Sequence, residues 1–185
     1  MTSAPPPSSD VDGCPLSEVH IHLLKNLHTQ VSTIISEFSK HGFSIWIVGG
    51  AVRDSFANIP LHDVDLATDA IPSKVLEILP NAIPTGVDYG TVTIPSTEGS
   101  GEIEITTLRK DGTYLDRRRP ESVRFGTSLA EDLQRRDFTI NAMAIDPVHL
   151  IFYDPHGGLN DLNSGKLSAV GNANDRLRED GLRIM

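Results

Sequence analysis

The 185-residue sequence lacks several features that would assign it to common protein classes. It contains one cysteine, Cys14, so no disulfide can form within the chain, and we expect a reducing, cytoplasmic location. No run approaches the roughly 20 consecutive apolar residues that a membrane-spanning helix needs, so no membrane partner is expected. Residues 1–15 have neither the apolar core of a signal peptide nor the arginines of a transit peptide, and we expect a disordered extension there.

Motifs of several enzyme classes are also missing. The serine-hydrolase pattern G-x-S-x-G and the zinc-protease pattern H-E-x-x-H do not occur. The dinucleotide fingerprint G-x-G-x-x-G and the P-loop G-x-x-x-x-G-K are absent as well. A net charge of −9 argues against extended nucleic-acid binding by this chain alone. Arginines nevertheless cluster in one region of the sequence, at positions 117, 118, 119, 124, 135 and 136.

Apolar residues recur in patterns that predict an α/β fold. The spacing predicts helices at 16–41, 51–58, 71–79, 129–141 and 174–185, and strands at 44–48, 64–67, 91–94, 102–108, 142–146 and 150–154. We therefore expect a mixed sheet flanked by helices and preceded by an N-terminal helix, with a polar loop at 111–124. The last helix has no glycine or proline stop before Met185, and we expect the chain to be truncated within it.

Asp63 and Asp65 occupy alternate positions of a predicted strand, so both side chains should lie on one face. Two carboxylates this close repel each other unless a proton or a cation neutralises them. Mg²⁺ prefers such hard oxygen ligands. A solvated acidic strand edge is the alternative interpretation of this pair.

A buried strand ends directly upstream in Gly49-Gly50, and a helix begins at once. Glycines let a bound group approach the backbone closely, and the first amides of a helix have no partner within the helix. Arg53, in the first turn, would add a charged contact to a phosphate. The alternative is a tight strand-to-helix turn in which Arg53 pairs with Asp54.

A third carboxylate is available on a later strand, where Ile103 and Ile105 point to the opposite face. Glu104 would complete a phosphoryl-transfer cluster if its strand lies beside that of Asp65. Glu102 shares the face of Glu104, and the alternation of the strand does not choose between them.

Two further segments combine charge with helical spacing. Asp137 and Asn141, four residues apart beside Arg135-Arg136, should share a helix face from which the arginines reach a triphosphate or an RNA backbone. Asp180 and Arg183 are neighbours on the last helix and offer acceptors and donors for a base edge. Solvated helix surface and an ordinary ion pair are the alternatives.

Taken in order, these segments resemble the head and early neck of class II tRNA nucleotidyltransferases, the CCA-adding enzymes, with bacterial poly(A) polymerases as close relatives. The resemblance covers residues 43–185 and implies a polymerase-beta-like nucleotidyltransferase head. The segments that carry it are Gly49-Gly50-Ala51-Val52-Arg53-Asp54, Asp63-Val64-Asp65, Arg118-Arg119-Pro120-Glu121-Ser122, Arg135-Arg136-Asp137-Phe138-Thr139-Ile140-Asn141 and Glu179-Asp180-Gly181-Leu182-Arg183.

The resemblance implies that CMP and AMP, from CTP and ATP, are added to the 3′ end of tRNA by two-metal phosphoryl transfer. Asp63 and Asp65 would hold two Mg²⁺ ions, and Glu104 would help to activate the RNA 3′-hydroxyl. The remaining residues would bind the nucleotide: Gly49, Gly50, Arg53 and Arg136 at the phosphates, Asp137 and Asn141 at the ribose, and Asp180 and Arg183 at the base.

The family pattern also implies a domain order of an extension at 1–15, a head at 16–172 and the start of a neck helix at 173–185. The neck, body and tail that hold tRNA would be supplied elsewhere, for example by a second chain. Three alternatives stay open: a poly(A) polymerase, an enzyme that adds only C or only A, and a non-catalytic head that binds a nucleotide or a partner.

Overall fold

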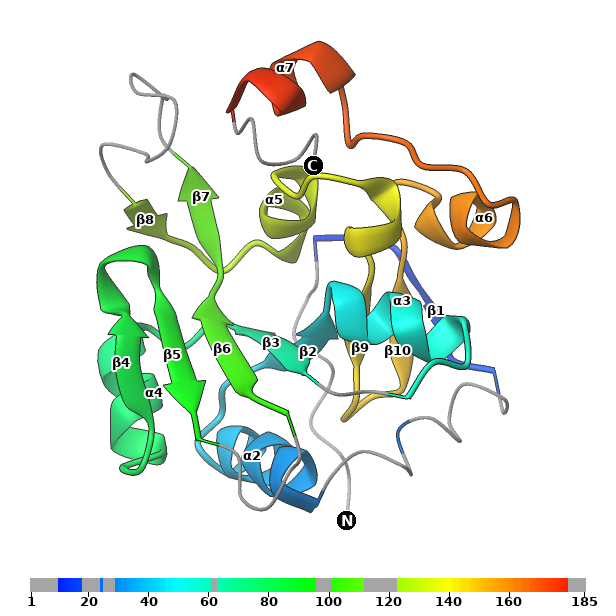
Figure 1. The fold of residues 1–185 in the computed structure, drawn as a ribbon. Helices are drawn as coiled ribbons and strands as arrows, with labels where there is room; N and C mark the ends of the chain where they lie inside the picture. The colour runs from blue at the N-terminus through cyan, green and yellow to red at the C-terminus, as the bar shows by residue number, and fades with distance from the viewer. Residues whose placement is uncertain are drawn as a thin grey trace.

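The computed structural model describes residues 10–17, 24, 29–60, 63–95, 101–111 and 123–179. These residues form one large mixed sheet with helices packed on it and a separate two-stranded ribbon (Figure 1). The predicted α/β class and mixed sheet are confirmed. None of the helices in the described part of the chain has the length and apolar character that crossing a bilayer requires.

The large sheet has the spatial order β1-β10-β9-β2-β3-β6-β5-β4. Its strands are β1 (Gly13–Pro15), β2 (Ile45–Val48), β3 (Val64–Thr68), β4 (Ile83–Gly86), β5 (Thr91–Ile94), β6 (Ile103–Thr107), β9 (Ala144–Asp146) and β10 (Ile151–Tyr153). Among these strands β3 and β6 pair in parallel, and the other neighbours pair antiparallel. The ribbon consists of β7 (Arg109–Asp111) and β8 (Val123–Phe125).

Two of the helices begin at residues that suit a helix start. Pro72 opens α4 at a position where its missing amide costs no hydrogen bond, and Ser128 caps α5 by accepting from the Glu131 amide. The α-helices are α2 (Thr29–Lys40), α3 (Gly50–Phe56), α4 (Pro72–Ile78), α5 (Leu129–Gln134), α6 (Gly158–Asn163) and α7 (Ala173–Glu179), with 3-10 helices η1 (Val87–Tyr89) and η2 (Thr139–Asn141).

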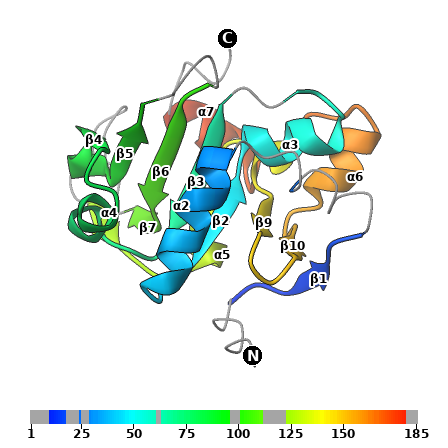
Figure 2. The ribbon, with the colours of Figure 1, turned by 90° about the horizontal axis from the view of Figure 1, so that it is seen from below.

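Apolar side chains form a core on each face of the large sheet, because strand side chains alternate between the faces. Helices α2, α3 and α4 contribute to the first core, which includes Ile47, Leu66 and Ile105. In Figure 2, α2 crosses β2 and β3 on the viewer's side. Helix α5 packs on the opposite face, where its leucines meet Trp46 and Val48. The face that carries α5 is also the one onto which the odd-numbered residues of β3 point.

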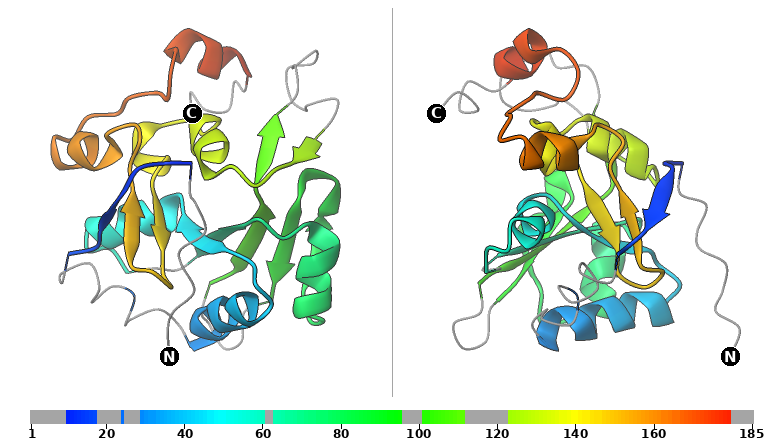
Figure 3. Two further views of the ribbon diagram at one scale, coloured as in Figure 1. Left: turned by 180° about the vertical axis from the view of Figure 1, so that it is seen from behind. Right: turned by 90° about the vertical axis from the view of Figure 1, so that its right-hand side faces the viewer.

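The N-terminal segment differs from its prediction. Residues 13–15, expected in a disordered extension, form β1 and pair with β10, as both views in Figure 3 show. The predicted helix at 16–41 was wrong at its start, because the Leu16 amide instead bonds to the Leu150 carbonyl at 2.9 Å. Its later part is confirmed as α2. A three-residue strand carries too little periodicity to be recognised, and Pro15 fits at an edge that needs no donor.

The predicted helix at 129–141 was also wrong in its second half. Helix α5 ends at Gln134, and η2 begins only at Thr139. Between them the backbone of residues 137–139 pairs with residues 168–170 through hydrogen bonds of 2.9 Å and an isolated β-bridge. This tertiary pairing takes the backbone groups that a continuous helix would have used.

Several smaller elements went unpredicted or lay partly in a predicted loop. Strand β4 and helix α6 had no prediction, and β7 and β8 occupy the two ends of the loop expected at 111–124. Residues 112–122 of that loop lie outside the described residues. Helix α7 begins at Ala173, where the sequence predicts the start of a neck helix, and its assignment to a neck stays a prediction.

Candidate active site

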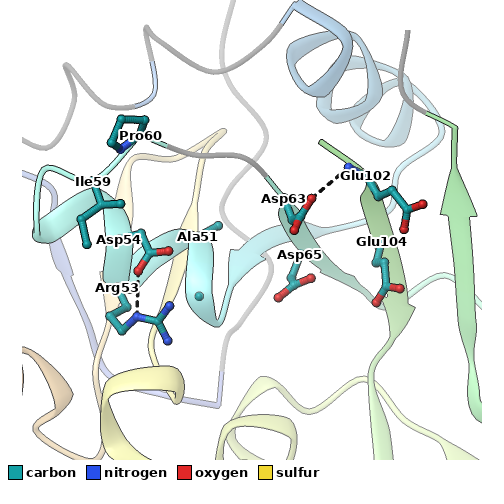
Figure 4. A pocket seen from close by; sticks show the side chains of 10 residues that line it. Ala51, Arg53, Asp54, Ile59, Pro60, Asp63, Asp65, Glu102 and Glu104 are labelled. Atoms are coloured by element: carbon teal, nitrogen blue, oxygen red, sulfur yellow. Dashed lines mark hydrogen bonds and ion pairs between the residues drawn. The ribbon is translucent and has the colours of Figure 1, made fainter. Parts of the chain in front are cut away.

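A pocket of about 530 Å³ lies between α3 and the N-terminal ends of β3 and β6 (Figure 4). Helix α3 and the chain that follows it supply one wall, and the two parallel strands supply the other. The lining residues are Gly50, Ala51, Arg53, Asp54, Ile59, Pro60, Asp63, Asp65, Glu102 and Glu104. The α3 wall therefore supplies the positive charge of Arg53, and most of the lining carboxylates come from the strands and the residues just before them.

The predicted carboxylate cluster is brought together by the parallel pairing of β3 and β6. This pairing places the Cα atoms of Asp65 and Glu104 directly opposite each other. The alternate residues Val64 and Leu66, like Ile103 on β6, are buried in the first core. Asp65 and Glu104 consequently both point away from that core and into the pocket, as the strand alternation predicted.

Asp63 precedes β3, and its Oδ1 accepts a hydrogen bond of 3.1 Å from the Glu102 amide. This contact ties the start of β3 to the start of β6. Glu102 lines the pocket as well, but Glu104 is the residue whose backbone is in register with Asp65. The strand pairing therefore favours Glu104 over Glu102 as the third carboxylate.

Burial and mutual repulsion raise the pKa values of two of these carboxyl groups. Burial raises the pKa of Asp65, and the charge of Asp63 adds to the rise, against the opposing charges of Arg136 and Arg53. Burial also raises the pKa of Glu104, followed by the charges of Asp65, Glu102 and Asp63. A bound cation would relieve this repulsion. Among the described residues, however, no three His, Cys, Asp or Glu side chains are gathered closely enough to form a metal site by themselves.

The predicted glycine pair forms the turn between β2 and α3. Gly49 has φ 67° and ψ −135°, a conformation that other residues rarely adopt. A Cβ atom at Gly49 would lie 3.1 Å from an Arg136 guanidinium nitrogen and 3.2 Å from Asp65 Oδ2. Because Gly49 has no side chain, the guanidinium of Arg136, which follows α5, and the carboxylate of Asp65 on β3 can both approach this turn.

Arg53 donates hydrogen bonds to two side chains, those of Asp54 and Asn141. Its Nε donates to Asp54 Oδ1 at 2.8 Å, so the pairing with Asp54 considered from the sequence is present. A second guanidinium nitrogen donates to Asn141 Oδ1 at 2.7 Å, which links α3 to η2. Arg53 is therefore held at the pocket by residues from two elements.

Asn141 and Asp137 are neighbours, although not on the continuous helix that was predicted. Asn141 Nδ2 donates to Asp137 Oδ1 at 3.2 Å across the turn that precedes η2. The Asn141 carbonyl accepts a long bond of 3.4 Å from Arg136, while its side chain holds Arg53. Asn141 thus connects the two predicted phosphate-binding arginines, and it lies behind the pocket wall rather than in it.

Asp132 is a site-related residue that the sequence interpretation missed. It is 1% exposed and accepts hydrogen bonds from both Arg135 and Arg136. Burial alone would raise its pKa, but the charges of Arg136 and Arg135 outweigh burial and lower the pKa below the ordinary value. An acidic residue three and four positions before two arginines on a helix was the available signal.

Helix α6 packs closely against η2 through contacts to Thr139. A Cβ atom on Gly158 would lie 2.2 Å from the Thr139 carbonyl oxygen, so only glycine allows this approach. The Thr139 hydroxyl also donates to Asp161 on α6 at 2.7 Å. The two contacts fix the 3-10 turn that carries Asn141. Of the predicted site residues, Asp180 and Arg183 lie outside the described residues.

Comparisons with known proteins agree with this geometry. The profile described as "Poly A polymerase head domain" matches residues 45–168. A CCA-adding enzyme of Geobacillus thermodenitrificans is 47% identical over 84% of this chain and 38% of its own length. The crystal structure of the Bacillus stearothermophilus CCA-adding enzyme in complex with CTP has a TM-score of 0.71 and 41% identity, over 83% of this chain and 36% of that one.

A further solved structure is a tRNA nucleotidyltransferase complexed with a primer tRNA and an incoming ATP analog. It has a TM-score of 0.63 and 31% identity over 82% of this chain and 42% of that one. The chain thus spans about two fifths of the length of the curated relatives and solved structures that it matches.

Proposed function

The chain belongs to the family of poly(A) polymerase head domains, and on this basis we propose that it adds CMP and AMP, from CTP and ATP, to the 3′ end of tRNA. The names of its relatives support CCA addition, and the solved neighbours contain CTP, or a primer tRNA with an ATP analog. Because the chain spans about two fifths of those proteins, the tRNA-holding parts would come from further sequence or from a second chain. The single cysteine, Cys14, fits the cytoplasmic location that we propose.

The observation that carries the proposal is the alignment of Asp65 with Glu104 in one pocket with Asp63 and Arg53. Carboxylates on one wall and a guanidinium on the other match the two charges of a nucleoside triphosphate bound with a divalent cation. Enzymes of nucleotidyltransferase families generally use divalent metal ions. The alternative of a non-catalytic head that binds only a partner is less favoured, because such a protein would have no use for Asp65 and Glu104 held close together against their mutual repulsion.

We assign Mg²⁺, as two ions, to Asp63 and Asp65. The donor set fits because both groups are hard oxygen ligands, and Mg²⁺ commonly takes one or two carboxylates together with substrate phosphates. This division of ligands accounts for a site in which protein carboxylates alone do not complete a coordination shell. When bound, the ions would stabilise the negative charge that develops on the phosphoryl oxygens.

The residues of the chain would act around that centre. The RNA 3′-oxygen attacks the α-phosphate, its proton passes toward Glu104, and pyrophosphate leaves. Arg53 and Arg136 bind the phosphates, and the Gly49-Gly50 turn lets them approach the backbone. Asp137 and Asn141 would lie near the ribose.

Base selection would rest on Asp180 and Arg183, which are assigned from the family pattern alone. We place them at the start of a neck, residues 173–185, that follows a head at 16–172. The described part of this segment is α7, which ends at Glu179.

The test is incorporation of labelled CTP and ATP, separately and together, into tRNA that lacks its CCA end, in the presence of Mg²⁺. We expect C addition before A addition, and loss of both in the Asp63→Ala/Asp65→Ala variant. A correctly folded chain that incorporates neither nucleotide, even with the tRNA-holding part of a relative added, would refute the proposal.

The family description favours poly(A) addition as the second candidate. The same assay separates it from CCA addition. Extension with ATP alone, on RNA that ends in any sequence, would identify a poly(A) polymerase. Addition that stops after C, or that requires a preceding C, would identify an enzyme that adds only part of the CCA sequence.

A further inference from the structure

Asp132 is a buried carboxylate whose two oxygens are divided between two arginines. Oδ1 accepts from Arg135 Nε at 2.9 Å and from a terminal nitrogen at 2.5 Å. Oδ2 accepts from Arg136 Nε at 3.2 Å and from a terminal nitrogen at 3.0 Å. Both arginine side chains are 18% exposed, and the carboxylate side chain is 1% exposed. Each guanidinium thus donates two hydrogen bonds to Asp132 from the edge formed by Nε and one terminal nitrogen, which fixes the plane of the group as well as its position.

Fold stability alone does not explain this arrangement. Replacing a buried ion pair by well-packed apolar residues of similar volume is often neutral or stabilising, so a buried pair is weak evidence of a purely structural role. Asp132 alone carries one negative charge against the two positive charges of the arginines. The remaining positive charge of Arg136 acts on Asp65, and it would also attract an anion that binds there.

The edge of Arg136 that Asp132 does not contact shows where that anion would bind. Asp132 occupies Nε and one terminal nitrogen, and the other terminal nitrogen faces the Gly49 turn. A Cβ atom at Gly49 would lie 3.1 Å from this nitrogen and 3.2 Å from Asp65 Oδ2. The bond from the same nitrogen to the Asn141 carbonyl is long, at 3.4 Å, and an incoming phosphate oxygen would replace it readily.

We propose that Asp132 is a positioning residue for nucleotide binding: it holds one edge of Arg136 so that the other edge meets the triphosphate beside Asp65. The inference rests on the proposed function for the identity of the ligand. Arg135 shares the same carboxylate but has no described contact with the Gly49 turn or with Asn141, so it provides a matched comparison.

The test is a double-mutant cycle measured as the Kd for CTP and, separately, for CMP. Asp132→Asn should weaken CTP binding about tenfold, the loss of one charge-assisted contact, and should change CMP binding less than about twofold. The effect should disappear in an Arg136→Gln background and persist in an Arg135→Gln background. An equal effect in both backgrounds, or an equal loss for CMP, would overturn the proposal.

Two further variants separate positioning from folding. Asp146→Asn removes another buried carboxylate, which bonds to the Val148 and His149 amides, and should lower stability without changing the Kd for CTP. If Asp132→Asn does not fold, Asp132→Glu keeps the charge but shifts the carboxylate outward by one methylene. It should weaken CTP binding in the same selective way, and unchanged CTP binding in Asp132→Glu would count against positioning.

The NMR signal of the Arg136 Nε–H group tests positioning without any nucleotide. In the wild-type chain this proton should exchange slowly with water, and in Asp132→Asn the protection should be lost. Unchanged protection would overturn the positioning role by itself. A wild-type chain with a protected Arg136 that binds neither CTP nor ATP would instead overturn the proposed function and the ligand named here, so the two failures are distinguishable.

Discussion

The two walls of the pocket differ in how their charges are balanced. On the basic side, Arg53 in the α3 wall is bonded to Asp54 and Asn141, and Arg136, which lies beside the Gly49 turn and outside the pocket lining, is bonded to Asp132 and Asn141. On the acidic side, in the part of the chain that the structure describes, no hydrogen bond ends on the side chain of Asp65 or Glu104. The arginines are oriented by other side chains, whereas the carboxylates are oriented by the register of two strands.

Under the proposed function, this difference would separate nucleotide binding, by the arginines, from catalysis, by the carboxylates. Internal partners lower the entropy that the arginines would lose when they bind phosphates. The carboxylates instead repel one another, and this repulsion contributes to the raised pKa values of Asp65 and Glu104. The charged forms of Asp65 and Glu104 therefore destabilise the fold, and these two groups become favourable only with a cation or a proton. The following four experiments test this contrast.

The largest expected effect comes from Asp65→Asn. Nucleotide incorporation should fall by about a thousandfold or more, because charge stabilisation at the reacting phosphate is lost. The free energy of unfolding at neutral pH should not fall, because the variant removes a repelled charge. Steady-state incorporation and urea denaturation measure the two quantities. Lower stability in Asp65→Asn would mean that the acidic wall supports the fold after all.

Glu104 and Glu102 form a matched pair on one face of β6. Glu104→Gln should lower incorporation about a hundredfold, the usual scale for a lost general base. Glu102→Gln should lower it less than about threefold, because its backbone amide and not its carboxylate holds Asp63. Parallel rate measurements on the two variants decide between them. The reverse ranking would assign the role of third carboxylate to Glu102.

Gly49→Ala tests the point at which the two walls meet. The new methyl group would require a strained backbone and would press on both Arg136 and Asp65. The free energy of unfolding should fall by about 1–3 kcal/mol, measured by urea denaturation. Gly126→Ala is the control, since nothing lies within 4 Å of its Cβ position. Equal losses in the two variants would show that the Gly49 turn has no special constraint.

The smallest expected effect is a pH dependence of stability. A carboxyl with a raised pKa, such as Asp65, favours the folded protein below its ordinary value of 3.8, and this contribution is lost as pH rises through the raised value. Asp65→Asn should therefore be more stable than wild type at neutral pH, by about 1 kcal/mol or less, and the gain should vanish in acid.

Asp132 should show the opposite pH dependence. Its lowered pKa adds stability above 3.8, and this contribution is lost as pH falls through the lowered value. The deficit of Asp132→Asn should therefore shrink in acid. Unfolding curves recorded from neutral pH downward measure both variants. Differences of the same sign would contradict the contrast between the walls.

The sequence predicted the parts of the fold in which periodicity is long or chemistry is dense. The strand that carries Asp65 and the helix at 71–79 are present because alternation and a proline start are local signals. The pairing of β1 with β10 and the break after α5 depend on residues more than 20 positions away. No local sequence pattern indicates such distant contacts, so the predictions of a disordered segment at residues 13–15 and of a continuous helix at 129–141 were wrong.

The same limit applies to the site. Strand alternation correctly put Asp65 and Glu104 on faces away from the core, but only the sheet order makes their strands neighbours. Asp132 resembled an ordinary surface acid in the sequence, because its burial results from the packing of α5 on the sheet. The roles of all these residues stay predictions until the variants are measured.

Asp65 and Glu104 are adjacent because β3 and β6 are in register, although α4, β4 and β5 lie between them in the chain. Their distance is thus independent of how long the intervening segment is. A circular permutant with new termini in that segment should keep the pair intact. A one-residue slip of β6 would instead bring Ile103 or Ile105 into the pocket and put Glu104 in the apolar core. Exchange of the whole segment between β3 and β6 should therefore perturb the Asp65–Glu104 pair less than a one-residue shift of β6 would.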